Sequence, residues 1–177
     1  MNLKFMKHWP ERMGGAETDF TYKIWSGIKE QPIDEHFLKW VNSKQSQDEK
    51  INALMDFTPK IHTIRKGNRW KAGDKIHLQI WEGKPWRSKV LQFAPVMECV
   101  SVQDIVIDHY QHNASEAAAV HIDGRWFGDF FREAEDSEGD VMNLLARNDG
   151  FTGAKHFAEY FNENLEGQII HWTPFKY

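Results

Sequence analysis

The segment between residues 60 and 75 combines side chains that could contact a nucleotide. It holds six Lys or Arg residues, one acid and one tryptophan. Cations bind phosphate groups, and an aromatic ring can stack on a base. The predicted phosphate contacts are four cations, with the indole stacking or bracing the groove: Arg65, Lys66, Arg69, Lys71 and Trp70. A solvated hairpin edge whose lysines prevent aggregation is the alternative, and the residue pattern alone slightly favours it.

Two further segments carry a candidate acid and a candidate histidine. Asp149, in the sequence LARNDGF, precedes a predicted helix, where a carboxylate could act as a general base or, more commonly, cap the helix. His171 lies in a predicted strand and could face a cleft, although a hydrogen-bonded structural histidine is the commoner outcome. His109, His112 and His121 are clustered but lack the cysteine or helix-borne acid typical of zinc sites. No metal and no cofactor are therefore predicted.

A strand over residues 60–65 is predicted to position the first group, because this segment alternates and is β-branched. In such a strand His62 shares a face with Lys60, while Thr63 lies on the opposite face with Arg65. Lys60 and Thr63 would converge only if the strand bends or twists. A Gly-Asp turn then leads into a second strand over residues 75–81.

The other elements indicate an α+β fold: a small, partly open β-barrel with inserted and flanking helices, in a single domain over residues 1–177. Strands are expected at 2–6, 90–93, 97–108 with a bend, 118–122, 125–131 and 168–172, with a tight Asp123-Gly124 turn. Helices are expected at 33–41, at 51–57, from Asp140 to about residue 146, and from Thr152 to Gly167. Residues 42–50 are expected to form a loop, and residues 129–140, with six acids and one arginine, a solvated loop or helix start.

The composition limits the kinds of binding partner and the cellular compartment that are expected for the chain. A net charge of −4 excludes a chain that grips polyanions with its whole surface, but it allows a local basic groove. The single cysteine, Cys99, lies in an apolar stretch and is predicted to be a buried, inert thiol. The N-terminal residues lack the apolar core of a signal peptide, and no run is long enough to span a bilayer. A cytoplasmic protein without a membrane partner is expected.

Taken together, these segments resemble the ASCH domain, a branch of the PUA-like β-barrel superfamily. The resemblance rests on KIHTIR at 60–65, RWKAGDKI at 69–76, LARNDGF at 145–151 with the helix behind it, and GQIIHW at 167–172. It covers residues 58–177, and residues 1–57 are an N-terminal extension with helices beyond a minimal member. The stretch from 109 to 140 is also longer than the smallest members need.

The resemblance implies two activities. Most ASCH domains are regarded as RNA-binding or RNA-associated modules. One bacterial branch is an amidohydrolase that deacetylates N(4)-acetylcytidine with a Lys, a Thr and a Glu, and the Lys-x-x-Thr of that branch falls on Lys60 and Thr63 here. Asp149 is the nearest equivalent of the Glu and is shorter by one methylene. A lysine in a partly desolvated cleft could take the proton of the threonine hydroxyl, and the aspartate could orient the lysine or relay protons.

Three hypotheses follow for the function. The first is an RNA- or nucleotide-binding domain with a basic cleft at residues 60–75, whose binding would be salt-sensitive. The second is an amidohydrolase acting on a modified nucleoside through Lys60, Thr63 and Asp149. The third is a structural or protein-interaction domain that uses its aromatic excess as core or interface. The acidic segment 129–140 would favour a small ligand or a short single strand if it lay beside the groove.

Overall fold

The chain has an α+β fold, as predicted. The computed structural model describes residues 1–28, 57–112, 115–131 and 140–177, which form nine strands in two sheets and three α-helices. These residues divide into two compact units, each with one sheet. Unit 1 comprises Met1–Lys60 and Asp74–Glu98, and unit 2 comprises Ile61–Gly73 and Cys99–Tyr177. Within the described ranges, no helix has the length and apolar character needed to cross a bilayer.

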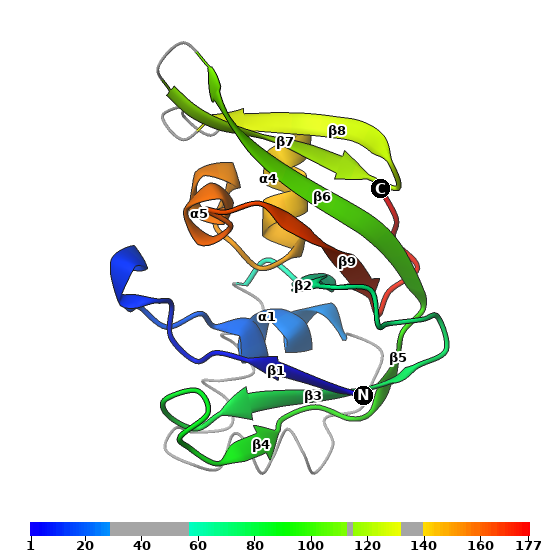
Figure 1. Ribbon diagram of the computed structural model, residues 1–177. Coiled ribbons are helices and arrows are strands. Elements are labelled where there is room, and N and C mark those ends of the chain that lie inside the picture. The colour runs from blue at the N-terminus through cyan, green and yellow to red at the C-terminus, as the bar shows by residue number, and fades with distance from the viewer. Residues whose placement is uncertain (29–56, 113–114, 132–139) are drawn as a thin grey trace. The chain divides into compact units, whose positions relative to one another are not determined.

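Unit 1 is a mixed sheet with one α-helix. Strand β3 lies between β1, which runs parallel to it, and β4, which runs antiparallel, while β5 also pairs antiparallel with β3 (Figure 1). The elements are β1 (Asn2–Phe5), the 3-10 helix η1 (Glu11–Met13), α1 (Phe20–Gly27), β3 (Lys75–Trp81), β4 (Val90–Gln92) and β5 (Met97–Glu98).

The core of unit 1 follows from the alternation of β3 and from clustered aromatic rings. Ile76, Leu78 and Ile80 are buried on one face of β3, because side chains alternate along a strand. The Phe5 ring contacts Phe20 and Phe93 edge-on, at centroid distances of 5.8 and 6.2 Å. Such edge-to-face pairs add stability beyond the area that they bury.

Unit 2 is an antiparallel five-stranded sheet with two helices against it. The strand order is β2-β9-β6-β7-β8, so the last strand of the chain lies between β2 and β6. Figure 1 shows α4 and α5 lying together against this sheet. The elements are β2 (His62–Lys66), β6 (Ser101–His112), β7 (Ser115–Ile122), β8 (Arg125–Phe131), α4 (Val141–Asn148), α5 (Ala154–Tyr160) and β9 (Leu165–His171).

Local signals placed several boundaries correctly. Asp123 and Gly124 have φ values of 50° and 74°, the left-handed pair that a tight β-hairpin turn requires, and they join β7 to β8. Asp140 is the N-cap of α4, because its side chain accepts a hydrogen bond from the Met142 N–H at 2.9 Å. Cys99 is buried, as expected.

Several boundary predictions are wrong. The helix predicted to end at Gly167 ends at Tyr160, and Gly167 lies in β9, where a Cβ atom would come within 2.4 Å of the Arg65 carbonyl oxygen. The bent strand predicted at 97–108 is two strands, and the strand predicted from residue 60 begins at His62. The predicted elements at 33–41, 42–50, 51–57 and 129–140 lie wholly or largely outside the described residues.

Candidate functional site

Strand β2 and the loop after it present the predicted cations of unit 2. We call residues 66–73 the basic loop. Lys66, Arg69 and Lys71 are exposed there, whereas Arg65 is half-buried. Gly67 and Gly73 have φ values of 85° and 87°, which glycine adopts without strain, so the chain can turn sharply at both ends of the loop.

Trp70 anchors the basic loop to the sheet. Its side chain is 2% exposed, so it can brace the loop but cannot offer a face to a base. The Trp70 N–H donates to the Gln168 Oε1 atom at 3.0 Å, and Gln168 Nε2 donates back to the Trp70 carbonyl at 3.4 Å. Main-chain bonds from Gly67 to Glu166 (3.0 Å) and from Gly73 to Cys99 (2.8 Å) tie both ends of the loop. The three cations therefore stand on a braced loop.

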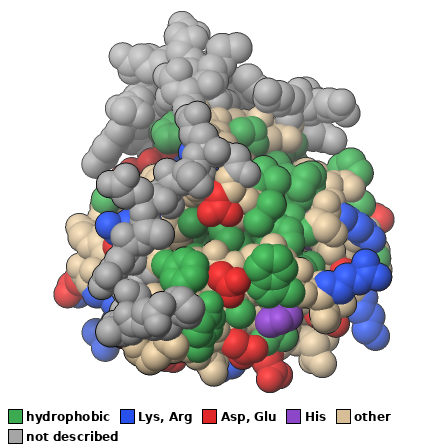
Figure 2. All heavy atoms as spheres, turned by 90° about the horizontal axis from the view of Figure 1, so that it is seen from above, with side chains coloured by type: hydrophobic (Ala, Val, Ile, Leu, Met, Phe, Trp, Pro, Cys, Tyr) green, Lys and Arg blue, Asp and Glu red, His purple; other side chains and the backbone are tan. Residues whose placement is uncertain are grey.

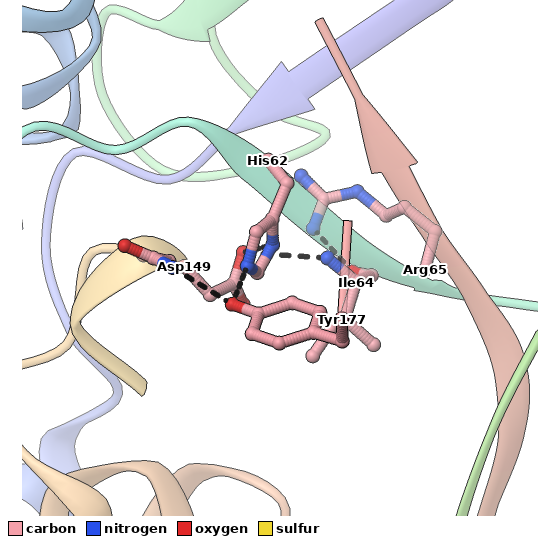
Figure 3. Close-up of polar contacts among 6 residues, drawn as sticks. His62, Ile64, Arg65, Asp149 and Tyr177 are labelled. Atoms are coloured by element: carbon pink, nitrogen blue, oxygen red, sulfur yellow. Dashed lines mark hydrogen bonds and ion pairs between the residues drawn. The ribbon is translucent and has the colours of Figure 1, made fainter. Parts of the chain in front are cut away.

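Arg65 is less exposed than the three cations of the basic loop. Its Nη1 atom donates to the Ile64 carbonyl at 3.0 Å (Figure 3). Burial lowers the pKa of Arg65 from its ordinary value, and attraction to the Asp149 carboxylate opposes that shift. The predicted phosphate contact of Arg65 therefore has less support than those of the three loop cations.

Asp149 joins the C-terminal end of α4 to β2. It is 3% exposed, and its Oδ1 atom accepts from the Ile64 N–H at 3.3 Å and lies 3.7 Å from His62 Nδ1 (Figure 3). Asp149 is the C-terminal cap residue of α4, and Gly153 is the N-cap of α5. The alternative in which Asp149 caps the following helix is therefore wrong, because the cap stands four residues further on.

A buried polar chain extends from this carboxylate to Tyr177. The Tyr177 Oη atom lies 2.7 Å from His62 Nε2 and accepts from Asn148 Nδ2 at 3.0 Å. Burial raises the pKa of Tyr177, and the Asp149 charge raises it further, which keeps the phenol protonated. The phenol can serve both contacts at once, because its oxygen can accept from Asn148 while its hydrogen is donated to an unprotonated Nε2. His62 and Tyr177 had no predicted role, although His62 stands inside the KIHTIR motif.

His171 and Ser101 extend the polar row across the sheet. His171 pairs with His62 on one side and with Ser101 on the other, and the two imidazole centroids lie 5.3 Å apart. Burial, together with the Lys176 charge, lowers the pKa of His171 to about 4, so the ring is neutral at pH 7. Within the described residues neither ring nitrogen has a hydrogen-bond partner. The sequence favoured a hydrogen-bonded structural histidine; the ring is buried in β9, but the expected hydrogen bond is not observed within the described residues.

The three predicted catalytic residues are divided between the units. Lys60 belongs to unit 1 and is 1% exposed, with Nζ 4.8 Å from the Phe20 ring centroid and 5.9 Å from that of Phe5. Thr63 is also 1% exposed and lies in β2 of unit 2 opposite Ile170. Asp149 contacts the main chain of Ile64 and the ring of His62 in the same unit.

Among the side chains that the structure describes, which include those of His109 and His121, no three His, Cys, Asp or Glu residues are grouped to hold an ion. His109 Nε2 forms a hydrogen bond with the Phe161 carbonyl at 2.9 Å, which gives this ring a structural role.

An acidic and aromatic surface lies on unit 2. Figure 2, which views the molecule from the β7 and β8 side of Figure 1, shows apolar side chains beside acidic ones. Tyr110 Oη and Trp126 Nε1 both donate to the Asp129 carboxylate, at 3.1 and 3.0 Å. Asp108 is exposed on β6, on the same face of the sheet as Asp129. A polyanion would be repelled by this surface.

Comparison of the chain with protein-family models, with curated proteins and with solved structures found no significant match. The function proposed below therefore depends on the residues and contacts of this chain.

Proposed function

We propose that the chain is an RNA- or nucleotide-binding domain of the ASCH, PUA-like type, and that the basic loop contacts phosphate. The observation that carries the proposal is the exposure of Lys66, Arg69 and Lys71 on a loop whose main chain is hydrogen-bonded to Glu166, Gln168 and Cys99. No acid lies between residues 60 and 73. Phosphate attracts such a set of cations, and its binding releases the counterions of the nucleic acid.

The bracing of the basic loop favours binding. A loop that is already ordered loses little conformational freedom when a ligand binds, so more of the interaction energy appears as affinity. Trp70 supplies this order from the interior, because its main chain exchanges two hydrogen bonds with Gln168. Recognition by the basic loop is therefore electrostatic, and base stacking has to come from another part of the molecule.

The decisive experiment measures the binding of a labelled single-stranded RNA by fluorescence anisotropy over a range of salt concentrations. The test variant replaces Lys66, Arg69 and Lys71 by Gln. The control replaces Lys155, Lys176 and Arg125 by Gln, which removes the same number of positive charges from other exposed positions of unit 2. Each phosphate contact in a single strand contributes about 0.7 to the slope of log K against log salt. The test variant is expected to lower the slope by about 2.

The control variant is expected to change the slope much less. If both variants weaken binding equally, the basic loop is not the site, and only the net charge of the chain matters. If the wild-type chain binds neither RNA nor nucleotides, the function is of another class, such as a protein-interaction domain.

A nucleoside amidohydrolase remains the second candidate because of one observation. The ionisable side chains of Lys60 and Asp149 are each 3% exposed or less, and such side chains are seldom buried so completely unless they are paired or functional. The test is acetate release from N(4)-acetylcytidine by the wild type, Thr63→Ala and Lys60→Met, each checked for folding by circular dichroism. Turnover by the wild type alone supports hydrolysis. No turnover by a folded wild type ends this candidate and leaves the binding proposal intact.

A further inference from the structure

The connection between β3 and β4 of unit 1 exposes an indole that contributes little to the core. We call residues 82–89 the tryptophan turn; Figure 1 shows this connection at the end of the unit 1 sheet. Trp86 is 84% exposed, the largest exposure among the described large hydrophobic side chains. Lys84, Arg87 and Lys89 are also exposed, and Glu82 is the one acid in this segment.

The turn holds Trp86 in a conformation that is unusual for a bulky residue. The Arg87 N–H donates to the Lys84 carbonyl at 3.2 Å, which closes a four-residue turn with Pro85 second and Trp86 third. Trp86 has a φ of 65°. A positive φ at the third position marks a type II turn, where glycine or asparagine is usual. A tryptophan there raises the free energy of the fold, because its Cβ atom crowds the backbone.

Further hydrogen bonds fix the tryptophan turn. The Ser88 hydroxyl accepts from the Gly83 N–H at 3.0 Å and donates to the Lys84 carbonyl at 2.9 Å. The Glu82 N–H donates to the Lys89 carbonyl at 3.0 Å, next to the last β3–β4 pair. The main chain that carries the indole and the cations is therefore held in one closed turn.

Trp86 has a cation and a second indole beside it. Its ring centroid lies 5.5 Å from that of the buried Trp81, at an interplanar angle of 50°. The Lys4 ammonium lies 4.9 Å from the Trp81 centroid and 6.0 Å from that of Trp86. These neighbours support one side of the Trp86 ring, and the high exposure of the side chain leaves most of it open to a ligand.

We propose that the tryptophan turn is a binding site for single-stranded nucleic acid, with Trp86 stacking on a base and Lys84, Arg87 and Lys89 contacting phosphates. Aromatic stacking platforms flanked by cations bind single strands with little sequence preference, because every base has a π-face. In a duplex the bases already stack on one another, so the indole would gain nothing. The site goes beyond the proposed function, because it lies in the other unit and uses different residues.

A single strand fits this turn better than two other polyanionic partners. A membrane-binding surface needs a broad apolar face, and Trp86 is the one large apolar side chain exposed in the turn. An acidic peptide would satisfy the cations but would leave the indole without a planar partner. A base with its phosphates uses both features.

The test compares the full-length chain with Trp86→Gly in the binding of labelled oligouridylate and of an RNA duplex of equal length. Glycine suits the positive φ of this position, so Trp86→Gly is expected to unfold at the same temperature as the wild type or a higher one. Its affinity for oligouridylate is expected to fall about tenfold or more, while Trp86→Phe keeps most of the affinity. Binding of the duplex is expected to be weaker and insensitive to Trp86→Gly.

The outcomes separate this site from the basic loop. The inference is overturned if Trp86→Gly and the wild type bind oligouridylate with equal affinity. It is also overturned if the chain binds phosphatidylserine vesicles through Trp86 but does not bind oligouridylate. If the triple Gln variant of the basic loop loses affinity but Trp86→Gly does not, the proposed function stands and this inference fails. If Trp86→Gly alone loses affinity, the tryptophan turn is the site and the basic loop is not.

Discussion

The main chain of Trp70 and the side-chain amide of Gln168 exchange two hydrogen bonds, so one glutamine of β9 anchors the middle of the basic loop. Gln168 is 6% exposed, and no water can readily replace it. Residue 168 comes almost a hundred positions after Trp70 in the sequence. The contact therefore couples strand pairing in unit 2 to the presentation of its exposed cations.

Replacing Gln168 by Leu is expected to destabilise the protein by about 1–3 kcal/mol, because a buried N–H and a buried carbonyl lose their partner. Urea unfolding followed by circular dichroism measures the change. Gln111→Leu, at an exposed position of β6, is the matched control and is expected to change the free energy of unfolding by less than about 0.5 kcal/mol. Equal effects of the two variants would contradict the anchoring role of Gln168.

Asp149 is expected to contribute to stability whether or not it takes part in catalysis. Asp149→Ala leaves the buried Ile64 N–H without the carboxylate that accepts from it, which costs about 1–3 kcal/mol. Asp149→Asn keeps an acceptor oxygen of the same reach and is expected to cost less. Thermal and urea unfolding of both variants check this order, and an Ala variant as stable as the wild type would disprove the tie between α4 and β2.

His171 is expected to make the fold sensitive to mild acid. Its pKa is lowered from 6.5 to about 4 by burial and by Lys176, so the unfolded chain takes up a proton on this ring before the folded chain does. The contribution of the neutral His171 ring to the free energy of unfolding is therefore fully present above about pH 6.5. It falls as the pH decreases towards 4 and changes no further below that pH. The loss amounts to at most about 3 kcal/mol.

The variant that checks this dependence is His171→Leu, which has no titratable ring. Its free energy of unfolding is expected to fall less than that of the wild type between about pH 7 and pH 5. Urea unfolding at both pH values gives the comparison. His121→Leu, a half-buried histidine on β7, serves as the control. Parallel pH profiles for the wild type and His171→Leu would assign the acid sensitivity to other groups.

Gly167→Ala is expected to disturb the pairing of β9 with β2. The new methyl group would lie 2.4 Å from the Arg65 carbonyl oxygen, and this backbone atom cannot rotate away. Overpacking of this kind costs about 1–3 kcal/mol. Gly128→Ala is the comparison, because its nearest neighbour is the flexible Met142 side chain at 3.2 Å. Thermal unfolding is expected to show the larger decrease for Gly167→Ala, and the reverse order would contradict the close approach.

The sequence predicted elements whose signals are local. The alternation in residues 75–81 predicted that strand with its observed ends, and the Asp123-Gly124 turn signal predicted the start of the strand at 125–131. These patterns depend on neighbours within a few residues, where periodicity and backbone preference act directly.

Long-range contacts could not be predicted in the same way. Gly167 resembled a helix end because glycine commonly stops helices, whereas its role depends on the Arg65 carbonyl of another strand. The partners of Asp149 were missed because Ile64 and His62 meet it only after β2 has joined the sheet. The sequence predicts that Trp70 either stacks on a base or braces the groove. Its burial within unit 2 depends on contacts with residues distant in the chain, which local patterns do not reveal.

The place of β9 in the sheet of unit 2 has a consequence for the order of folding. Strand β2 has β9 as its one described neighbour in this sheet, and β6 needs β9 on one side, although β9 comes about a hundred residues after β2 in the chain. During synthesis, β2 and β6 therefore leave the ribosome with unpaired edges that wait for residues 165–171. Contacts so distant in sequence slow folding, and an unpaired strand edge is open to aggregation until its partner arrives.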